Sequence, residues 1–194
     1  DETSRGLGDV YKRQKLNTSM HILNNGTHAL VFPPRCGTRW IAEKLYNNKL
    51  INSFGPHHNF DYDSSADVKI FMFVRNPFTR ERSVHRWLLE TNQIKLEDVS
   101  FENYVNSSWF DHEPSYCSRY GDLNNFVEHV NIDNINDFFI KELNLKIDKY
   151  DNSYHSVDDG INDVEAYTDS MIEKVLNKYK QDIKLINFDL TSYI

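Results

Sequence analysis

Two short apolar runs stand out in the first half of the chain, and each is followed by a polar turn. The runs cover residues 28–32 and 68–74, and their length and composition are typical of buried strands. A third run at residues 20–23 is suited to pairing at an edge of the same sheet. We therefore expect residues 28–32 and 68–74 to form central strands.

Apolar residues recur at helical spacing beyond the first turn, where Ile41, Leu45 and Leu50 follow one another. Two further amphipathic patterns, at residues 133–145 and 167–180, also predict helices. Strands and helices in this order favour an α/β fold. In such a fold a central parallel sheet is flanked by helices, and ligands bind at the carboxyl ends of the strands.

The turn at residues 32–40 has the features of an anion-binding loop at a helix N-terminus. Pro33 and Pro34 carry no backbone N–H, so donors begin at Arg35, and Gly37 lets the backbone approach a ligand closely. Free N–H groups, the positive end of the helix dipole and two guanidiniums would converge on one point. On its own, the turn also fits an ordinary strand-to-helix connection.

A second segment repeats this arrangement after the run at residues 68–74. Arg75 ends the strand, and Pro77 suits the first turn of a helix. If the helix begins there, three residues share one face at three- and four-residue steps: Arg80, Ser83 and Trp87. This helix is therefore expected to carry a phosphate-binding face.

Together the two segments resemble the sulfotransferases that use 3′-phosphoadenosine 5′-phosphosulfate (PAPS). In that family a loop of the form Pro-Lys-x-Gly-Thr-Thr-Trp binds the 5′-phosphosulfate, and residues 34–40, Pro-Arg-Cys-Gly-Thr-Arg-Trp, are similar to it. A later element, Arg-Asp/Asn-Pro-x-x-Arg-x-x-Ser, binds the 3′-phosphate, and residues 75–83 fit it. The resemblance covers about residues 20–190 and implies a P-loop-NTPase-like, three-layer α/β fold.

The resemblance also implies which residues hold PAPS and its product, adenosine 3′,5′-bisphosphate (PAP). The 5′ end is assigned to the loop residues Arg35, Cys36, Gly37, Thr38, Arg39 and Trp40. Trp40 would pack on the adenine, with a place in the helix core as the alternative. Arg75 and Ser83 would bind the 3′-phosphate, since a guanidinium can make a bidentate contact. No metal is expected.

A histidine between the two segments is expected to remove the proton from the acceptor hydroxyl, as in many sulfotransferases. His57 and His58 are the candidates, because a histidine can be neutral near pH 7 and accept a proton. A surface pair without a catalytic role is the alternative. The fallback bases are carboxylates: Glu43, Asp61 and Asp63.

Two features place the chain nearer to carbohydrate sulfotransferases than to the cytosolic small-molecule enzymes. Arg35 stands where the cytosolic branch has lysine, and arginine stabilises charge but does not readily give up its proton. Residues 179–185 look like a closing Tyr-x-x-Asp-x-x-Leu, and the cytosolic phrase Arg-Lys-Gly-x-x-Gly-Asp-Trp is missing. A carbohydrate hydroxyl is thus the expected acceptor, with phenols, alcohols, amines and peptide tyrosines left open. Aromatic residues that could line its cleft, or simply form core, are Trp109, Phe110, Tyr116, Tyr120 and Phe126.

Composition predicts one globular domain. The chain has 194 residues, of which 39% are hydrophobic and 26% charged, enough for a single core. Residues 1–19 show no sustained period, and Arg5 to Gln14 resemble translated adaptor sequence, so residues 20–194 are taken as the domain. Without a membrane-length apolar run or a signal segment, we expect a soluble, cytoplasmic protein, with a microbial or viral origin plausible. The two cysteines, Cys36 and Cys117, indicate neither a disulfide framework nor a zinc site.

The net charge of −7 argues against nucleic-acid partners, yet the arginines gather near the two segments. Six of the nine lie there: Arg35, Arg39, Arg75, Arg80, Arg82 and Arg86. Arg82 and Arg86 are expected to be solvated helix residues, whereas Arg75 follows a buried strand.

Two alternatives to a sulfotransferase stay open. A P-loop kinase or other NTPase shares the strand–loop–helix arrangement, but the Walker pattern would need glycine at Phe32, lysine at Thr38 and serine or threonine at Arg39. A non-catalytic module that binds sulfated or phosphorylated ligands could use the same loops without a base.

Overall fold

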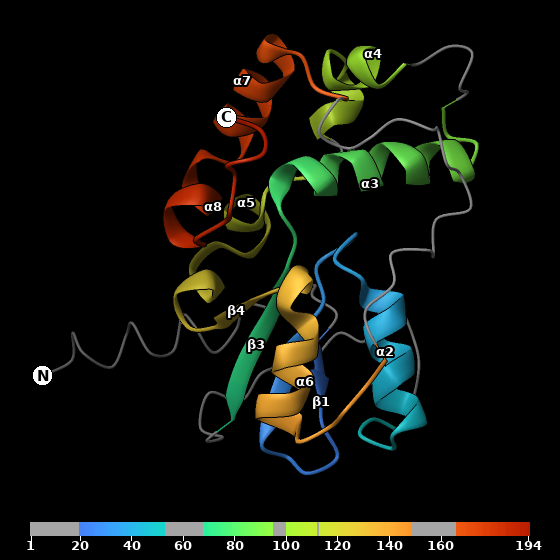
Figure 1. Ribbon diagram of the computed structural model, residues 1–194, viewed down its shortest axis with the longest axis vertical. Helices are drawn as coiled ribbons and strands as arrows, with labels where there is room; N and C mark the ends of the chain where they lie inside the picture. Colours follow the sequence, from blue (N-terminus) through green and yellow to red (C-terminus); the bar gives the residue numbers. More distant parts are fainter. Residues whose placement is uncertain (1–19, 53–67, 95–99, 112, 149–165) are drawn as a thin grey trace, which may run out of the picture.

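A computed structural model describes residues 20–52, 68–94, 100–111, 113–148 and 166–194 (Figure 1). The predicted tail at residues 1–19 lies outside the described residues. Four strands form one sheet in the order β1-β2-β3-β4. They are β1 (Met20–Ile22), β2 (His28–Val31), β3 (Lys69–Val74) and β4 (Glu128–Asn131).

The predicted strands lie where the sequence placed them. β2 and β3 are central, and β1 pairs at the edge beside β2. β2 pairs with β3 in parallel, as β3 does with β4. The sheet is not wholly parallel, however, because a short turn returns β1 antiparallel onto β2, with Leu23 N–H donating to the His28 carbonyl at 2.9 Å. β4 was not predicted from the sequence.

Seven α-helices occur in the described part of the chain. They are α2 (Thr38–Asn47), α3 (Pro77–Glu90), α4 (Phe101–Val105), α5 (Tyr116–Tyr120), α6 (Ile135–Leu143), α7 (Asp169–Lys178) and α8 (Lys180–Leu185). Three short 3₁₀ turns, η1 (Ser108–Asp111), η2 (Gly121–Asn125) and η3 (Ile132–Asn134), connect some of them. The helices predicted at residues 133–145 and 167–180 are thereby confirmed as α6 and α7.

Aromatic packing fixes α2 and α6 on one face of the sheet. Phe71 and Phe73 alternate along β3 and meet Phe138 of α6 edge-on, with ring centroids 4.9 and 5.2 Å apart. Phe139 of α6 in turn contacts Trp40 of α2 at 6.2 Å. The described residues therefore form an α/β fold with a mixed, mostly parallel sheet, and a third layer stays a prediction.

α3 begins directly after β3 and lies across the carboxyl end of the sheet, between the sheet and the pair α4 and α7 (Figure 1). The Asn76 side chain accepts from the Phe78 N–H at 3.0 Å, and Pro77 occupies the first helical position. Helices pack on more than one side of α3, so three of its charged residues, Arg80, Glu81 and Arg82, are buried.

The prediction that Arg82 is solvated is wrong. Its side chain is fully buried, and its guanidinium lies 4.4 Å from the centre of the Phe101 ring of α4. Arg86, one turn further along the helix, is half-buried. α4 covers the face of α3 that the helical period alone had assigned to solvent.

Within the described ranges, no helix is long and apolar enough to span a membrane.

Candidate functional site

The loop between β2 and α2 has an unusual backbone. Arg35 and Gly37 both have left-handed conformations, with φ of +67° and +69°. A side-chain-bearing residue in this region costs roughly 1–2 kcal/mol, and strained residues are enriched at active sites and ligand-binding turns. The Thr38 hydroxyl donates to the Pro33 carbonyl at 3.2 Å and so ties the two ends of the loop together. This hydrogen bond and the two left-handed residues give the loop a conformation that differs from both a strand and a helix.

The first turn of α2 is electrostatically suited to an anion. Gly37 is its N-cap, and the first turn contains no acidic side chain. The N–H groups of a first helical turn have no acceptor inside the helix, and the helix dipole is positive there. A negative group placed at this end of α2 would therefore be stabilised.

The two sequence segments meet at the carboxyl ends of β2 and β3. Arg35 Nε donates to Ser83 Oγ of α3 at 3.2 Å. Arg75 Nη1 lies 3.5 Å from the Arg35 carbonyl, and Arg75 Nε donates to Thr79 Oγ1 at 3.2 Å. Residues 35 and 83, which are 48 positions apart in the chain, are thus in direct contact.

Positive charge is concentrated where these side chains meet. Arg75 is 3% exposed and Ser83 is 1% exposed, while Arg35 is half-buried with its guanidinium 5.9 Å from the centre of the Trp87 ring. Burial lowers the pKa of Arg35 to about 10; the charge of Glu90 raises that pKa, and the charge of Arg75 lowers it further. The two guanidiniums repel each other, and a bound anion would relieve that repulsion.

The other loop residues differ in their exposure to solvent. Arg39 is exposed at the start of α2, and Trp40 is 5% exposed with its ring packed on Phe139, so that Trp40 takes the core position foreseen as the alternative. Cys36 is fully buried, and burial raises the pKa of its thiol, which makes it a poor nucleophile. Trp40 and Cys36 are thus part of the core, whereas the Arg35 guanidinium contacts Ser83 and Trp87 of α3.

Arg80 does not share the predicted phosphate-binding face of α3. It is fully buried and is directed to protein acceptors: Nη1 donates to the Pro114 carbonyl at 3.1 Å and to the Tyr179 hydroxyl, and Nη2 lies 3.7 Å from Glu113. Its Nε lies 3.5 Å from the Pro34 carbonyl, directly behind the loop. Arg80 supports the loop, while Ser83 and Trp87 of the same helix contact Arg35.

The expected base cannot be placed. His57, His58, Asp61 and Asp63 lie outside the described residues. Glu43, the other fallback, is half-buried on α2.

Most of the aromatic residues proposed for an acceptor cleft belong to the core. Phe110, Tyr116 and Tyr120 are at most 7% exposed. Trp109 is half-buried, and Phe126 is 68% exposed.

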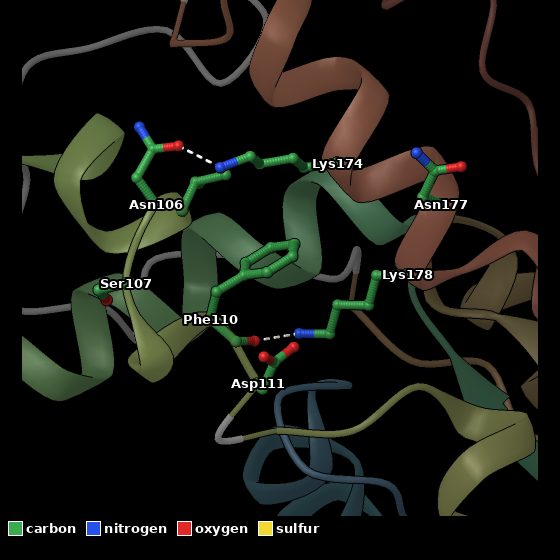
Figure 2. Close-up of a pocket in the computed structure, with 8 residues that line it drawn as sticks. Asn106, Ser107, Phe110, Asp111, Lys174, Asn177 and Lys178 are labelled. Carbon is green, nitrogen blue, oxygen red and sulfur yellow. Dashed lines mark hydrogen bonds between the residues drawn. The ribbon is translucent and has the colours of Figure 1, made fainter.

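A shallow hollow of about 420 Å³ lies between the α4–η1 segment and α7, on the side of α3 away from the sheet (Figures 1 and 2). Figure 2 shows Lys174 and Lys178 reaching across it, where they donate to Asn106 Oδ1 and the Phe110 carbonyl. Lys178 also pairs with Glu81 at 2.7 Å. One of the two lysines is neutralised by the buried Glu81 carboxylate, which makes the hollow a weaker anion site than the loop.

Sequence reasoning missed two contributors to the site. Thr79 receives a hydrogen bond from Arg75, and its position one turn into α3 could have revealed it. Tyr116, named only as an aromatic residue, contacts both segments through its hydroxyl, and no local pattern predicts a contact across 80 positions.

The donor set fits a ligand with two anionic groups, because it combines two guanidiniums, a buried hydroxyl and a helix N-terminus. In the described part of the chain, no three histidine, cysteine, aspartate or glutamate side chains gather as metal ligands. Comparisons with models of known protein families, with curated proteins and with solved structures found no match to the chain.

Proposed function

We propose that the chain is a PAPS-dependent sulfotransferase that transfers a sulfuryl group to a hydroxyl, with a carbohydrate hydroxyl as the first acceptor to test. The contact between Arg35 and Ser83 carries the proposal. It brings together the two segments that, by resemblance, bind the opposite ends of the donor.

The chemistry asked of these residues is positioning and charge stabilisation. In the transfer, the bond between sulfur and the 5′-phosphate oxygen breaks, a bond from sulfur to the acceptor oxygen forms, and a base takes the acceptor proton. Arg35, at the loop, would stabilise the negative charge that develops on the departing phosphate. Arg75 and Ser83 would hold the 3′-phosphate and fix the donor in line. His57 or His58 stays the predicted base.

Calorimetric titration with PAP, ATP and NAD tests the donor class before any acceptor is known. We expect PAP to bind and ATP and NAD to bind at least tenfold more weakly, because only PAP offers phosphates at both the 3′ and 5′ positions. Folded protein that gives no heat with PAP would overturn the proposal. Binding of ATP in preference to PAP, with dependence on Mg²⁺, would favour an NTPase.

Ser83→Ala tests the 3′-phosphate assignment. Loss of a hydrogen bond to a charged group costs about 1.5–3 kcal/mol, so the affinity for PAP should fall about tenfold or more. Ser108→Ala, at an exposed position in η1, is the matched control and should leave the affinity unchanged. Unchanged PAP binding by both variants would remove Ser83 from the site.

A further inference from the structure

One oxygen atom, the hydroxyl of Tyr116, contacts both segments of the candidate site. It donates to the Arg75 carbonyl at 3.1 Å and accepts from the Arg75 N–H at 2.9 Å. The thiol sulfur of Cys36, in the loop next to Arg35, lies 3.1 Å from the same oxygen. A single group on α5 therefore contacts the loop after β2 and the residue after β3.

The position of Arg75 explains why its backbone needs this partner. The register of β3 and β4 ends at the pair Val74 and Asn131, so Arg75 is the first residue beyond the paired part of the strand. Its N–H and carbonyl are buried, and buried backbone groups need partners. The Tyr116 hydroxyl supplies both an acceptor and a donor where the neighbouring strand has ended.

Tyr116 is itself firmly held. The Asp182 carboxylate of α8 accepts from the N–H groups of Tyr116 and Cys117 at 2.8 and 2.7 Å, and both Tyr116 and Asp182 are fully buried. The Arg80 guanidinium lies 4.7 Å from the centre of the Tyr116 ring. Burial raises the pKa of the Tyr116 phenol well above its ordinary value, so the hydroxyl keeps the proton that it donates.

We propose that Tyr116 is a positioning residue whose hydroxyl fixes the separation between the Arg35 loop and Arg75, so that the site selects ligands with anionic groups at both ends. The proposal rests on the proposed function, which assigns one end of the donor to each segment. Tyr116 has no direct role toward the ligand in this scheme. Its effect should be largest for ligands that bind both segments at once.

Tyr116→Phe tests this by removing one oxygen and keeping the ring. The affinity for PAP should fall about tenfold, whereas the affinities for adenosine 5′-monophosphate and adenosine 3′-monophosphate should change less than about threefold each. Tyr120→Phe is the matched control, because Tyr120 is a buried tyrosine on the same helix that makes no hydrogen bond to Cys36 or Arg75. Equal losses for all three ligands would indicate a general structural role and overturn the proposal.

Amide hydrogen exchange measured by NMR gives a readout that needs no ligand. If the hydroxyl couples the two segments, Tyr116→Phe should accelerate exchange at Arg75 and at residues 36–38 together, while the amides of β2 stay protected. Acceleration at Arg75 alone would refute the coupling. If the wild-type protein does not bind PAP but both regions respond, the coupling stands and the sulfotransferase proposal fails.

Discussion

Arg35 combines a left-handed backbone with a half-buried guanidinium next to a second arginine. Each of these conditions is unfavourable in the free protein. A bound anion would offset the cost of burying Arg35 next to Arg75, so these conditions are expected at an anion-binding site. The side chain would act as an electrostatic group, since its proton is not readily given up even with the pKa lowered to about 10.

Arg35→Ala should lower transfer at least about 100-fold, the cost of removing one charge-stabilising donor from a reaction centre. Alanine keeps the left-handed strain and removes the guanidinium, so the fold should be retained. The assay is release of PAP from PAPS with a panel of mono- and oligosaccharide acceptors. Lys141→Ala, at an exposed position on α6, is the control. Near-normal turnover of Arg35→Ala alongside a normal control would sink the assignment.

The lowered pKa of Arg35 gives binding a pH dependence. A bound anion favours the charged guanidinium, so the pKa of Arg35 in the complex lies above its value of about 10 in the free protein. The affinity for PAP should therefore be highest below about pH 10, where Arg35 is charged in the free protein. It should fall as the pH rises above about 10, by up to about tenfold per pH unit. Titration calorimetry between pH 7 and 10.5 measures this. An affinity that does not change up to pH 10.5 would contradict a role for Arg35 in holding the anion.

Among the elements, α3 carries a buried carboxylate that is paired with another helix. Glu81 of α3 is fully buried and receives hydrogen bonds from the Tyr104 and Tyr179 hydroxyls and from Lys178 of α7. Burial lowers the pKa of Lys178, whereas the charge of Glu81 raises it. This pair holds α7 against α3 on the side away from the sheet.

Lys178→Met should destabilise the protein by about 3–5 kcal/mol, because it leaves the Glu81 carboxylate buried without its cation. The double variant Glu81→Gln with Lys178→Met should be less destabilised than the sum of the two single changes, by about 1–3 kcal/mol. Denaturant unfolding of the four proteins measures both quantities. Strictly additive losses would mean that the ion pair does not join the two helices.

The helices and strands differed in how far the sequence predicted them. β2 and β3 were found because each is a continuous apolar run, and α3 because Pro77 suits the first turn of a helix. β4 was missed because Glu128 and His129 break the apolar pattern, and a strand of four residues becomes stable only beside β3. The burial of Arg82 was missed for a related reason, since the residues that cover it come from α4.

At the scale of the whole molecule, ligand binding should appear as stability. A ligand that binds only the folded state stabilises it by about 2.7 kcal/mol at 100 times its dissociation constant. For 194 residues this corresponds to a rise in melting temperature of roughly 5–10 °C. Differential scanning fluorimetry with PAP should show the rise, and ATP at the same concentration should not. Equal shifts with both nucleotides would argue against a PAP-selective site.

The candidate site was predictable in its parts and not in its assembly. Arg35, Gly37, Arg75 and Ser83 carry local signals, because backbone conformation and charge at a strand-to-helix junction are local properties. The orientation of Arg80 into the core depends on Pro114, Glu113 and Tyr179, none of which is near it in the chain. The spacing of residues in the sequence therefore does not predict which of several arginines will form hydrogen bonds or ion pairs within the protein.

The contacts of Tyr116 set an order for assembly. Tyr116 lies 80 residues after Cys36 and 66 before Asp182, so its contacts with the loop after β2 and with α8 each close a long loop, whereas Arg35 meets Ser83 across only 48 positions. Closures of this length come late in folding, because their entropy must be lost before the contacts repay it. During synthesis, both segments of the candidate site are complete long before α8 exists to hold Tyr116. The support that Tyr116 gives to the two segments would then form later in folding than the direct contact between Arg35 and Ser83.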